Sequence, residues 1–453
     1  MDDLDDAAAR DLLRPLDGKL DQPSTVEIAG LLRAGRRRLR RRRLLTGSGL
    51  AAVTAVVLLA VPIGLAAVPD GRSADPAPDH GAQPGPAPGD PASPDGSGTG
   101  SPPPPPTRCM PQRLPLPAGA TSSQVFDGDP TGRYLVGVAR DDRTARTWTL
   151  LWDRGAMTVL EPETTDPAQL LVNSAGVVAG DGVVVRDGRA VLVAWVYRDG
   201  RYVDLTDPDG GYVGDVMDLN ERGDVLGGIR TLAYRGKPIG TKGGPPESPD
   251  VAEVPGSNPV VWGAGAEQDP TWLPQPVTGR HYATGLDDDG TVVGGIVDFG
   301  PAGTTRTTAW APDGAARTLA PPPRHAATTG ALSVRGGWVL GWSAAPSGAE
   351  QHFVPTRWNP RTGQAAPVTG LAWAAAINRH GWLAGFVRNA SGVETPAVLA
   401  GDRPFALPMP AGAVPGKEGP AAVSLSDDGR VVGGSVSVAP DDAATAAVRW
   451  TCE

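Results

Sequence analysis

One short phrase decides the fold of this chain, and its clearest copy reads Leu219-Asn220-Glu221-Arg222-Gly223-Asp224-Val225-Leu226-Gly227. An Asn or Asp opens a tight turn by bonding its own backbone, and Gly provides a positive φ angle that most residues resist. The β-branched residues on either side of such turns suit a pleated strand. The phrase therefore predicts two strands joined by a tight turn.

The phrase recurs along the chain, which indicates a repeat protein. Its seven copies end at Gly137, Gly180, Gly227, Gly294, Gly341, Gly385 and Gly433. The steps between these glycines are 43, 47, 67, 47, 44 and 48 residues. A period of about 40 to 50 residues with several short strands is typical of a β-propeller blade. We therefore predict an all-β, seven-bladed β-propeller with four-stranded blades over residues 108–453.

A tryptophan marks the third strand of most units. Trp152, Trp195, Trp310, Trp358 and Trp450 follow their glycines by 15, 15, 16, 17 and 17 residues. Trp262 follows its glycine by 35 residues, which indicates an insertion from about Thr231 to Asn258. The sixth unit has Ala400 at the expected place. We expect these large side chains to pack between blades.

The two cysteines stand near the two ends of the repeat region. The seventh unit stops at Glu453 without a fourth strand, and the segment from Cys109 to Pro117 matches the missing piece. We therefore predict that this N-terminal strand closes the last blade and that Cys109 and Cys452 form a disulfide. Such a bond persists outside the cytoplasm and closes a loop of over 300 residues, which stabilises the fold by several kcal/mol.

The sequence before the repeats predicts a membrane anchor. Residues 44–68 carry no charge and are long enough to cross a bilayer. Seven arginines in Arg36–Arg43 precede this segment, which places residues 1–43 in the cytoplasm and the arginines against anionic lipid. A cleaved signal peptide is the alternative, but its apolar part is usually shorter. We predict a single-pass plasma-membrane protein with an extracytoplasmic propeller.

A linker separates this transmembrane helix from the repeats. Residues 69–107 contain 13 Pro and seven Gly, so they cannot bury enough apolar surface to fold. We predict a disordered stalk. Residues 1–107 hold 13 acidic and 12 basic side chains, a net of −1, and the whole chain carries −9, which leaves −8 for the repeats. This charge argues against a nucleic-acid partner.

In this topology the stalk enters on the face of the Asn and Asp turns, so the opposite face points outward. Links between blades and the insertion place candidate binding residues on that outward face: Tyr212, Tyr234, Arg235, His281, Tyr282, Arg324, His325 and Trp373. The preferred function is non-catalytic binding of a protein or cell-envelope ligand by a monomeric ectodomain. A sensor that relays to the tail of residues 1–35 is one alternative.

Catalysis is the other alternative, as a hydrolase or lyase acting on an envelope polysaccharide. The predicted inner strands are mostly small or apolar, with Asp215 and Asp218 as exceptions. The five histidines lack metal-ligand spacing, and the run Asp287 to Gly290 lacks the spaced ligands of a calcium loop. We therefore predict no catalytic residues, no metal and no cofactor, and a protein that is not an enzyme.

The segment Leu150-Leu151-Trp152-Asp153-Arg154-Gly155-Ala156-Met157-Thr158-Val159-Leu160, with the Asn-x-x-Gly-x-Val-x-Gly phrases of later units, resembles the HAF-type extracellular repeat proteins. The resemblance covers about 330 residues. It implies an extracytoplasmic β-propeller and no particular reaction. The excess of Arg over Lys hints at a GC-rich, actinobacterial-like genome.

Overall fold

The structure is a computed structural model that describes residues 102–453, apart from 187–188, 208–211, 231–256, 275–279, 298–303, 326–327, 346–351, 360–361, 415–420 and 440–443. The predicted cytoplasmic tail, transmembrane helix and most of the linker lie outside the described residues, as do Tyr234 and Arg235. Within the described ranges, no helix has the length and apolar character to cross a membrane.

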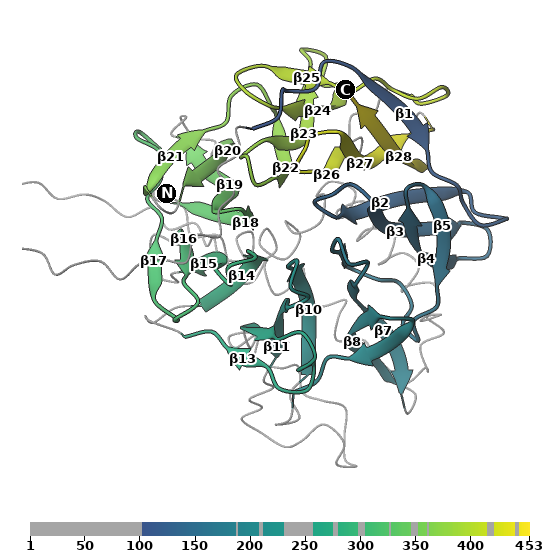
Figure 1. Cartoon of the computed structure of the whole chain (residues 1–453), viewed down its shortest axis with the longest axis horizontal. Helices are drawn as coiled ribbons and strands as arrows, with labels where there is room; N and C mark the ends of the chain where they lie inside the picture. Colours follow the sequence, from purple (N-terminus) through teal and green to yellow (C-terminus); the bar gives the residue numbers. More distant parts are fainter. Residues whose placement is uncertain are drawn as a thin grey trace, which may run out of the picture. The chain divides into compact units, whose positions relative to one another are not determined.

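Seven four-stranded antiparallel sheets surround a central axis (Figure 1). Blade 1 contains β2 (Ser122–Gly128), β3 (Tyr134–Asp141), β4 (Arg146–Asp153) and β5 (Ala156–Leu160). Blade 2 contains β6 (Leu170–Val172), β7 (Val178–Arg186), β8 (Arg189–Arg198) and β9 (Arg201–Asp204). Blade 3 contains β10 (Tyr212–Leu219), β11 (Val225–Arg230), β12 (Ser257–Trp262) and β13 (Thr271–Trp272).

The remaining blades repeat this order from the axis outward. Blade 4 contains β14 (Arg280–Leu286), β15 (Val292–Val297), β16 (Thr305–Trp310) and β17 (Ala316–Thr318). Blade 5 contains β18 (Thr329–Arg335), β19 (Trp338–Ala345), β20 (His352–Asn359) and β21 (Gln364–Pro367). Blade 6 contains β22 (Trp373–Ile377), β23 (Leu383–Arg388), β24 (Glu394–Leu399) and β25 (Pro404–Ala406). The predicted seven-bladed, four-stranded propeller is therefore confirmed.

Blade 7 joins the two ends of the repeat region. It contains β26 (Ala421–Leu425), β27 (Val431–Ser437) and β28 (Thr445–Cys452), and its outer strand is β1 (Cys109–Arg113). The β1–β28 register places Cys109 opposite Cys452, and a disulfide joins the two residues. Both the predicted closing strand and the predicted disulfide are confirmed.

The Asn of the repeated phrase explains how blades lock together. In blade 6, Asn378 Oδ1 accepts hydrogen bonds from the amides of His380 and Trp382, both at 3.0 Å. Its Nδ2 donates to the carbonyl of Ser426 in blade 7 at 3.1 Å. One side chain therefore closes its own turn and ties that turn to the next blade. Asn173 and Asn220 make the same pair of contacts in blades 2 and 3.

The tryptophans fill the space between blades, as predicted. Each of the six marker tryptophans is at most 2% exposed. Trp358 donates from Nε1 to the carbonyl of Ala320, on the link that leaves blade 4, at 2.7 Å. In blade 6 the register differs from the prediction by one residue: Leu399, not Ala400, stands opposite Leu383, as Trp358 stands opposite Val339.

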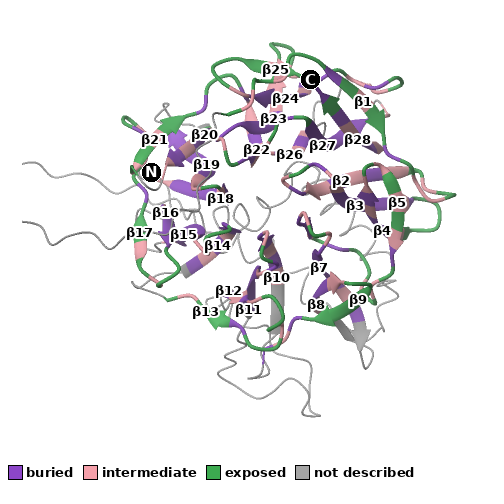
Figure 2. Ribbon diagram, in the orientation of Figure 1, coloured by how far each residue is buried: buried purple, intermediate pink, exposed green. Residues whose placement is uncertain are grey.

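The hydrophobic core is divided among the blade interfaces rather than gathered in one layer. One cluster, for example, joins Val293 and Ala309 of blade 4 to Val339 and Trp358 of blade 5. Figure 2 shows buried residues along the inner strands and exposed ones on outer strands such as β9 and β13. The apolar residues are thus used in contacts between blades, and polar residues at the ends of the inner strands can form a site around the axis.

Candidate functional site

Blade 5 breaks the repeated phrase at its first position. Val334 pairs with Val339, two residues before Gly341, as Leu286 pairs with Val292, two residues before Gly294. The next residue is Asp287 in blade 4 and Arg335 in blade 5. An arginine thus stands where blades 1 to 4 and blade 6 have the turn-forming Asn or Asp and blade 7 has Ser426.

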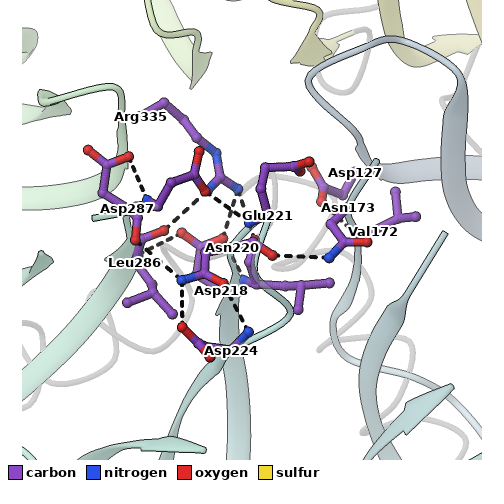
Figure 3. Close-up of polar contacts among 12 residues, drawn as sticks. Asp127, Val172, Asn173, Asp218, Asn220, Glu221, Asp224, Leu286, Asp287 and Arg335 are labelled. Atoms are coloured by element: carbon purple, nitrogen blue, oxygen red, sulfur yellow. Dashed lines mark hydrogen bonds and ion pairs between the residues drawn. The ribbon is translucent and has the colours of Figure 1, made fainter. Parts of the chain in front are cut away.

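Arg335 reaches back over two blades toward the axis (Figure 3). Its Nη1 donates to the carbonyl of Leu286 in blade 4 at 3.2 Å. Its Nη2 donates to Asp218 Oδ1 at 3.1 Å and to the carbonyl of Leu219 at 3.3 Å, both in blade 3. The Arg335 side chain is 21% exposed and that of Asp218 is 8% exposed. The ion pair is therefore largely shielded from solvent.

Two aspartates occupy equivalent places at the ends of inner strands. Asp127 lies on β2, and its Oδ2 accepts from the amide of Val172 in blade 2 at 3.1 Å. Asp218 lies on β10, and its Oδ2 accepts from the amide of Leu286 at 2.8 Å. Each carboxylate therefore holds its inner strand against the next blade, and each also faces the charge of Arg335.

Three more carboxylates from the turns complete this group. Asp287 of blade 4 accepts hydrogen bonds from the amides of Gly336 at 2.9 Å and Gly337 at 2.6 Å. These are amides of the blade 5 turn, which has no Asn of its own to accept them. Glu221 accepts hydrogen bonds from the amide and hydroxyl of Ser174. The amide of Glu221 donates to Asp288 Oδ1 at 2.9 Å. We call Asp127, Asp218, Glu221, Asp287, Asp288 and Arg335 the axial cluster.

Burial changes the protonation of this cluster. Desolvation raises the pKa of Asp127 to about 7, although the charge of Arg335 lowers it. Desolvation also raises the pKa of Asp218 and of Glu221. Burial lowers the pKa of Arg335, but the attraction of Asp218 and Asp127 outweighs it, so the pKa lies above its usual value. The cluster therefore holds one permanent cation and one carboxyl group, that of Asp127, whose pKa is about 7.

The axial cluster carries more negative than positive groups. Of the five N–H donors of Arg335, three have partners within the described part of the chain. The excess of carboxylates favours a ligand that carries ammonium or guanidinium groups. Among the described residues, no group of three or more His, Cys, Asp or Glu side chains has the arrangement to hold a metal ion.

The predicted outward-face residues lie at the other ends of the inner strands. His281 and Tyr282 lie on β14, where His281 is 4% exposed and packs near the Trp310 ring. Tyr212 and Trp373 are the first residues of β10 and β22. Arg324 is exposed and His325 partly buried on the link between β17 and β18. The structure does not bring these residues to the axial cluster, and their role in binding stays a prediction.

Sequence reasoning found only part of the axial cluster. It singled out Asp218 and Asp215, but the charge of Asp215 acts on Asp181 of blade 2. It missed Asp127 and Arg335. A signal was present, because blade 5 has Arg335 where blades 1 to 4 and blade 6 have Asn or Asp and blade 7 has Ser426, and functional sites are where repeat rules are broken.

Comparison with known family profiles and with curated protein sequences finds no match. Solved structures share the fold. The β-propeller domain of the Trilobed protease from Pyrococcus furiosus is 11% identical, with 73% of this chain and 95% of that chain covered and a TM-score of 0.48. An oligogalacturonate lyase in complex with manganese is 15% identical, with 76% and 93% covered and a TM-score of 0.47. TolB from Acinetobacter baumannii is 10% identical, with 64% and 63% covered and a TM-score of 0.36.

The seven four-stranded sheets establish a β-propeller, and the comparisons correct one prediction. The prediction that the protein is not an enzyme is contradicted, because the solved structures with this fold include a lyase and a domain of a protease. The physical reason lies in the strand ends. Small apolar residues on the inner strands do not exclude catalysis when Asp127 and Arg335 stand where those strands end. The fold alone therefore decides neither for nor against catalysis.

Proposed function

We propose that this protein is a membrane-anchored, extracytoplasmic receptor whose propeller binds a protein or cell-envelope ligand at the axial cluster, which lies on the face of the Asn and Asp turns where the stalk enters and not on the outward face expected from the sequence. The observation that carries this proposal is Arg335. It replaces the turn-forming residue of the repeat and turns its charge toward carboxylates from blades 1 and 3. Blades 2, 3 and 6 have Asn at this position, whereas the Gly336-Gly337 turn of blade 5 lets Arg335 contact blades 3 and 4.

The proposed location rests on two separate observations. Residues 44–68 have the length and apolar character of a transmembrane helix, preceded by seven arginines. The ring is closed by a disulfide, a bond that persists in oxidising compartments. We propose that residues 69–107 form a stalk between the membrane and the propeller. The amide and hydroxyl of Thr107 both donate to the carbonyl of Glu453, which fixes the point where the stalk meets the propeller.

The ligand fits the charge of the site. Carboxylates outnumber the single guanidinium, and residues 108–453 carry a net charge of −8 from the counts given above. We infer that the ligand presents cationic groups, such as the basic side chains of a protein or the amino groups of an envelope polymer. Electrostatic attraction of this kind raises the association rate and weakens with salt.

The test measures co-sedimentation of the full-length protein with cell envelopes of its source organism. The variant Glu221→Gln/Asp288→Asn removes two charges at the more exposed edge of the axial cluster. We expect binding to fall about tenfold or more, since loss of each favourable charge contact costs about 1 kcal/mol. The control Asp199→Asn/Asp402→Asn removes the same charge from exposed outer hairpins, away from the axis. Equal loss in both variants, or no loss in either, would reject the axial site.

A second candidate, a hydrolase or lyase acting on an envelope polysaccharide, is favoured by one specific observation. A carboxyl whose pKa is about 7 serves as a general acid or base at neutral pH, and Asp127 has this pKa beside the positive charge of Arg335. The variant Asp127→Asn separates the two functions. A receptor retains envelope binding and shows no turnover in either form, whereas an enzyme loses the release of sugar fragments while it still binds.

A further inference from the structure

Two hydrogen-bonded pairs of buried hydroxyl groups lie where blades 4 and 5 meet, at the opposite ends of the inner strands from Arg335. The amide and hydroxyl of Thr307 both donate to Thr329 Oγ1 at 2.9 Å. Thr329 pairs with Ser343 across β18 and β19, and Ser343 Oγ lies 2.7 Å from Thr356 Oγ1. All four residues are at most 1% exposed. Burying hydroxyls is costly unless they are hydrogen-bonded, so these pairs fix their directions.

The pair of Thr356 and Ser343 continues to His325, and we call these three residues the hydroxyl chain. The Nδ1 atom of this histidine lies 2.7 Å from Ser343 Oγ. The imidazole is partly buried, and within the described residues no hydrogen bond reaches its Nε2. Because Nδ1 points toward Ser343, Nε2 points away from it.

The hydroxyl protons of Thr356 and Ser343 determine the tautomer of the His325 ring. Thr356 donates its single hydroxyl proton to the carbonyl of Val354 at 3.0 Å. Ser343 must then donate its own proton to Thr356, which leaves Ser343 Oγ as an acceptor toward His325. The neutral imidazole therefore carries its proton on Nδ1, and Nε2 presents a free lone pair. With this assignment the contacts His325–Ser343, Ser343–Thr356 and Thr356–Val354 are all hydrogen bonds, and no other assignment of the neutral ring achieves this.

The residue before this histidine has an unusual backbone. The amide of His325 donates to the carbonyl of Pro322 at 3.1 Å, which defines a tight turn, and Arg324 within it has a φ of 71°. A turn with Pro at its second position and positive φ at its third normally takes Gly or Asn there. The turn instead holds an exposed arginine directly before His325. Unfavourable backbone geometry of this kind is typical of binding and catalytic sites.

We propose that Arg324 and His325 form a binding site for a phosphoryl group. Guanidinium groups match the anionic oxygens of phosphate, and Nε2 of His325 accepts the proton of a P–OH group. The site requires both charge and a proton on the ligand, so it discriminates phosphate from sulfate, which has the same shape and no proton at neutral pH. It is independent of the axial cluster and of the function proposed there.

The tautomer is tested by long-range ¹H–¹⁵N NMR on the full-length protein labelled at histidine. We expect the His325 signals to show a protonated Nδ1 and a bare Nε2 near neutral pH. The variants Ser343→Ala and Thr356→Val each break the hydroxyl chain, and we expect either one to shift His325 toward the other tautomer. A wild-type His325 with its proton on Nε2 overturns the proposal.

Ligand binding is tested in the same sample with inorganic phosphate, glycerol phosphate and sulfate. We expect saturable shifts of His325 with a phosphate, at least tenfold weaker binding of sulfate, and no shift of His380, whose ring lies tilted beside that of Trp382. Arg324→Asn keeps a residue that tolerates positive φ and removes the charge, so phosphate binding should be lost. Arg201→Asn, on the exposed strand β9, should bind as the wild type does.

The outcomes separate the sources of the phosphoryl group. A response to inorganic phosphate alone identifies free phosphate as the ligand, whereas a response to glycerol phosphate that grows as the pH falls toward about 6, where a monoester carries a P–OH proton, identifies a terminal phosphate monoester. Equal binding of sulfate and phosphate overturns the proposed role of Nε2. No response to either phosphate, or an equal response in Arg324→Asn, overturns the site.

Discussion

Single residues at the turns serve both the local backbone and the neighbouring blade. Gly429 has a φ of 70°, which L-residues with a Cβ adopt only at a cost. A Cβ on this glycine would lie 2.5 Å from Cζ3 of Trp382 in blade 6. The turn therefore requires Gly for its own conformation and for the approach of the adjacent tryptophan.

Gly429→Ala should lower the free energy of unfolding by about 2 to 4 kcal/mol, the sum of about 1 to 2 kcal/mol of backbone strain and the cost of overpacking Trp382. Denaturant unfolding of the full-length protein measures this loss. Gly155→Ala is the matched control, because Gly155 has a φ of 89° and no atom within 4 Å of an added Cβ. Equal losses in the two variants would show that strain alone acts and that the blade contact has no energetic role.

Asp127 makes stability depend on pH. Its pKa is about 7 in the folded protein, compared with 3.8 for an aspartate that is not perturbed. Because the pKa of Asp127 is higher in the folded state than in the unfolded state, its protonation stabilises the folded protein at low pH. This stabilisation is complete below about pH 4 and is lost as the pH rises to about 7. The upper limit is about 4 kcal/mol at about 1.4 kcal/mol per pKa unit, which partial solvent exposure reduces to about 1 to 2 kcal/mol.

The measurement compares the wild type with Asp127→Asn in denaturant titrations between about pH 4 and pH 7.5. Asparagine keeps an acceptor for the amide of Val172 and cannot titrate. We expect the stability of the wild type relative to the variant to fall by about 1 to 2 kcal/mol across this range. A constant difference would mean that Asp127 has the same pKa in both states.

At the scale of strands and turns, local chemistry makes the unit predictable. The turn-forming Asn, the positive-φ Gly and the marker Trp act within one blade or its neighbour, so their spacing reveals the blades. The exact register is less predictable, because inner strands contain bulges, as between Ala374 and Ala376 and between Ala422 and Ser424. The hairpins between second and third strands also differ in length, so counting from Gly385 chose Ala400 in place of Leu399.

Trp358→Phe tests the link between blades that the third strands make. The change leaves the carbonyl of Ala320 without the indole donor and opens a small cavity, since Trp358 is fully buried. We expect the free energy of unfolding to fall by about 2 to 4 kcal/mol. Trp272→Phe makes the same change at a side chain that is 40% exposed, so its effect should stay below about 0.5 kcal/mol. A similar effect at both positions would contradict the role of the buried indole donor.

At the scale of the whole molecule, closure was predictable and the axial cluster was not. The unfinished seventh unit and the two terminal cysteines identify the closing strand from sequence alone. The axial cluster depends on which inner-strand ends meet around the axis, and Asp218 and Arg335 are 117 residues apart. No local pattern relates two such residues, so only the arrangement of the blades reveals their contact.

Ring closure should control the stability of the whole propeller. The Cys109–Cys452 disulfide joins residues 343 positions apart and lies where β1 pairs with β28. Cys109→Ser/Cys452→Ser should therefore lower the free energy of unfolding by about 2 to 5 kcal/mol. Because β1 is held otherwise by main-chain pairing with β28, we expect local opening to begin at this seam.

Hydrogen exchange measures both effects in the oxidised wild type and the double variant. The amides of β1 and β28 should lose protection first, and those of blades 3 and 4, across the ring, should change only as far as global stability falls. Reductant should reproduce these changes in the wild type and leave the variant unaffected. Uniform loss of protection in all blades would instead show that the disulfide acts on the unfolded chain alone, and that the ring opens without a preferred seam.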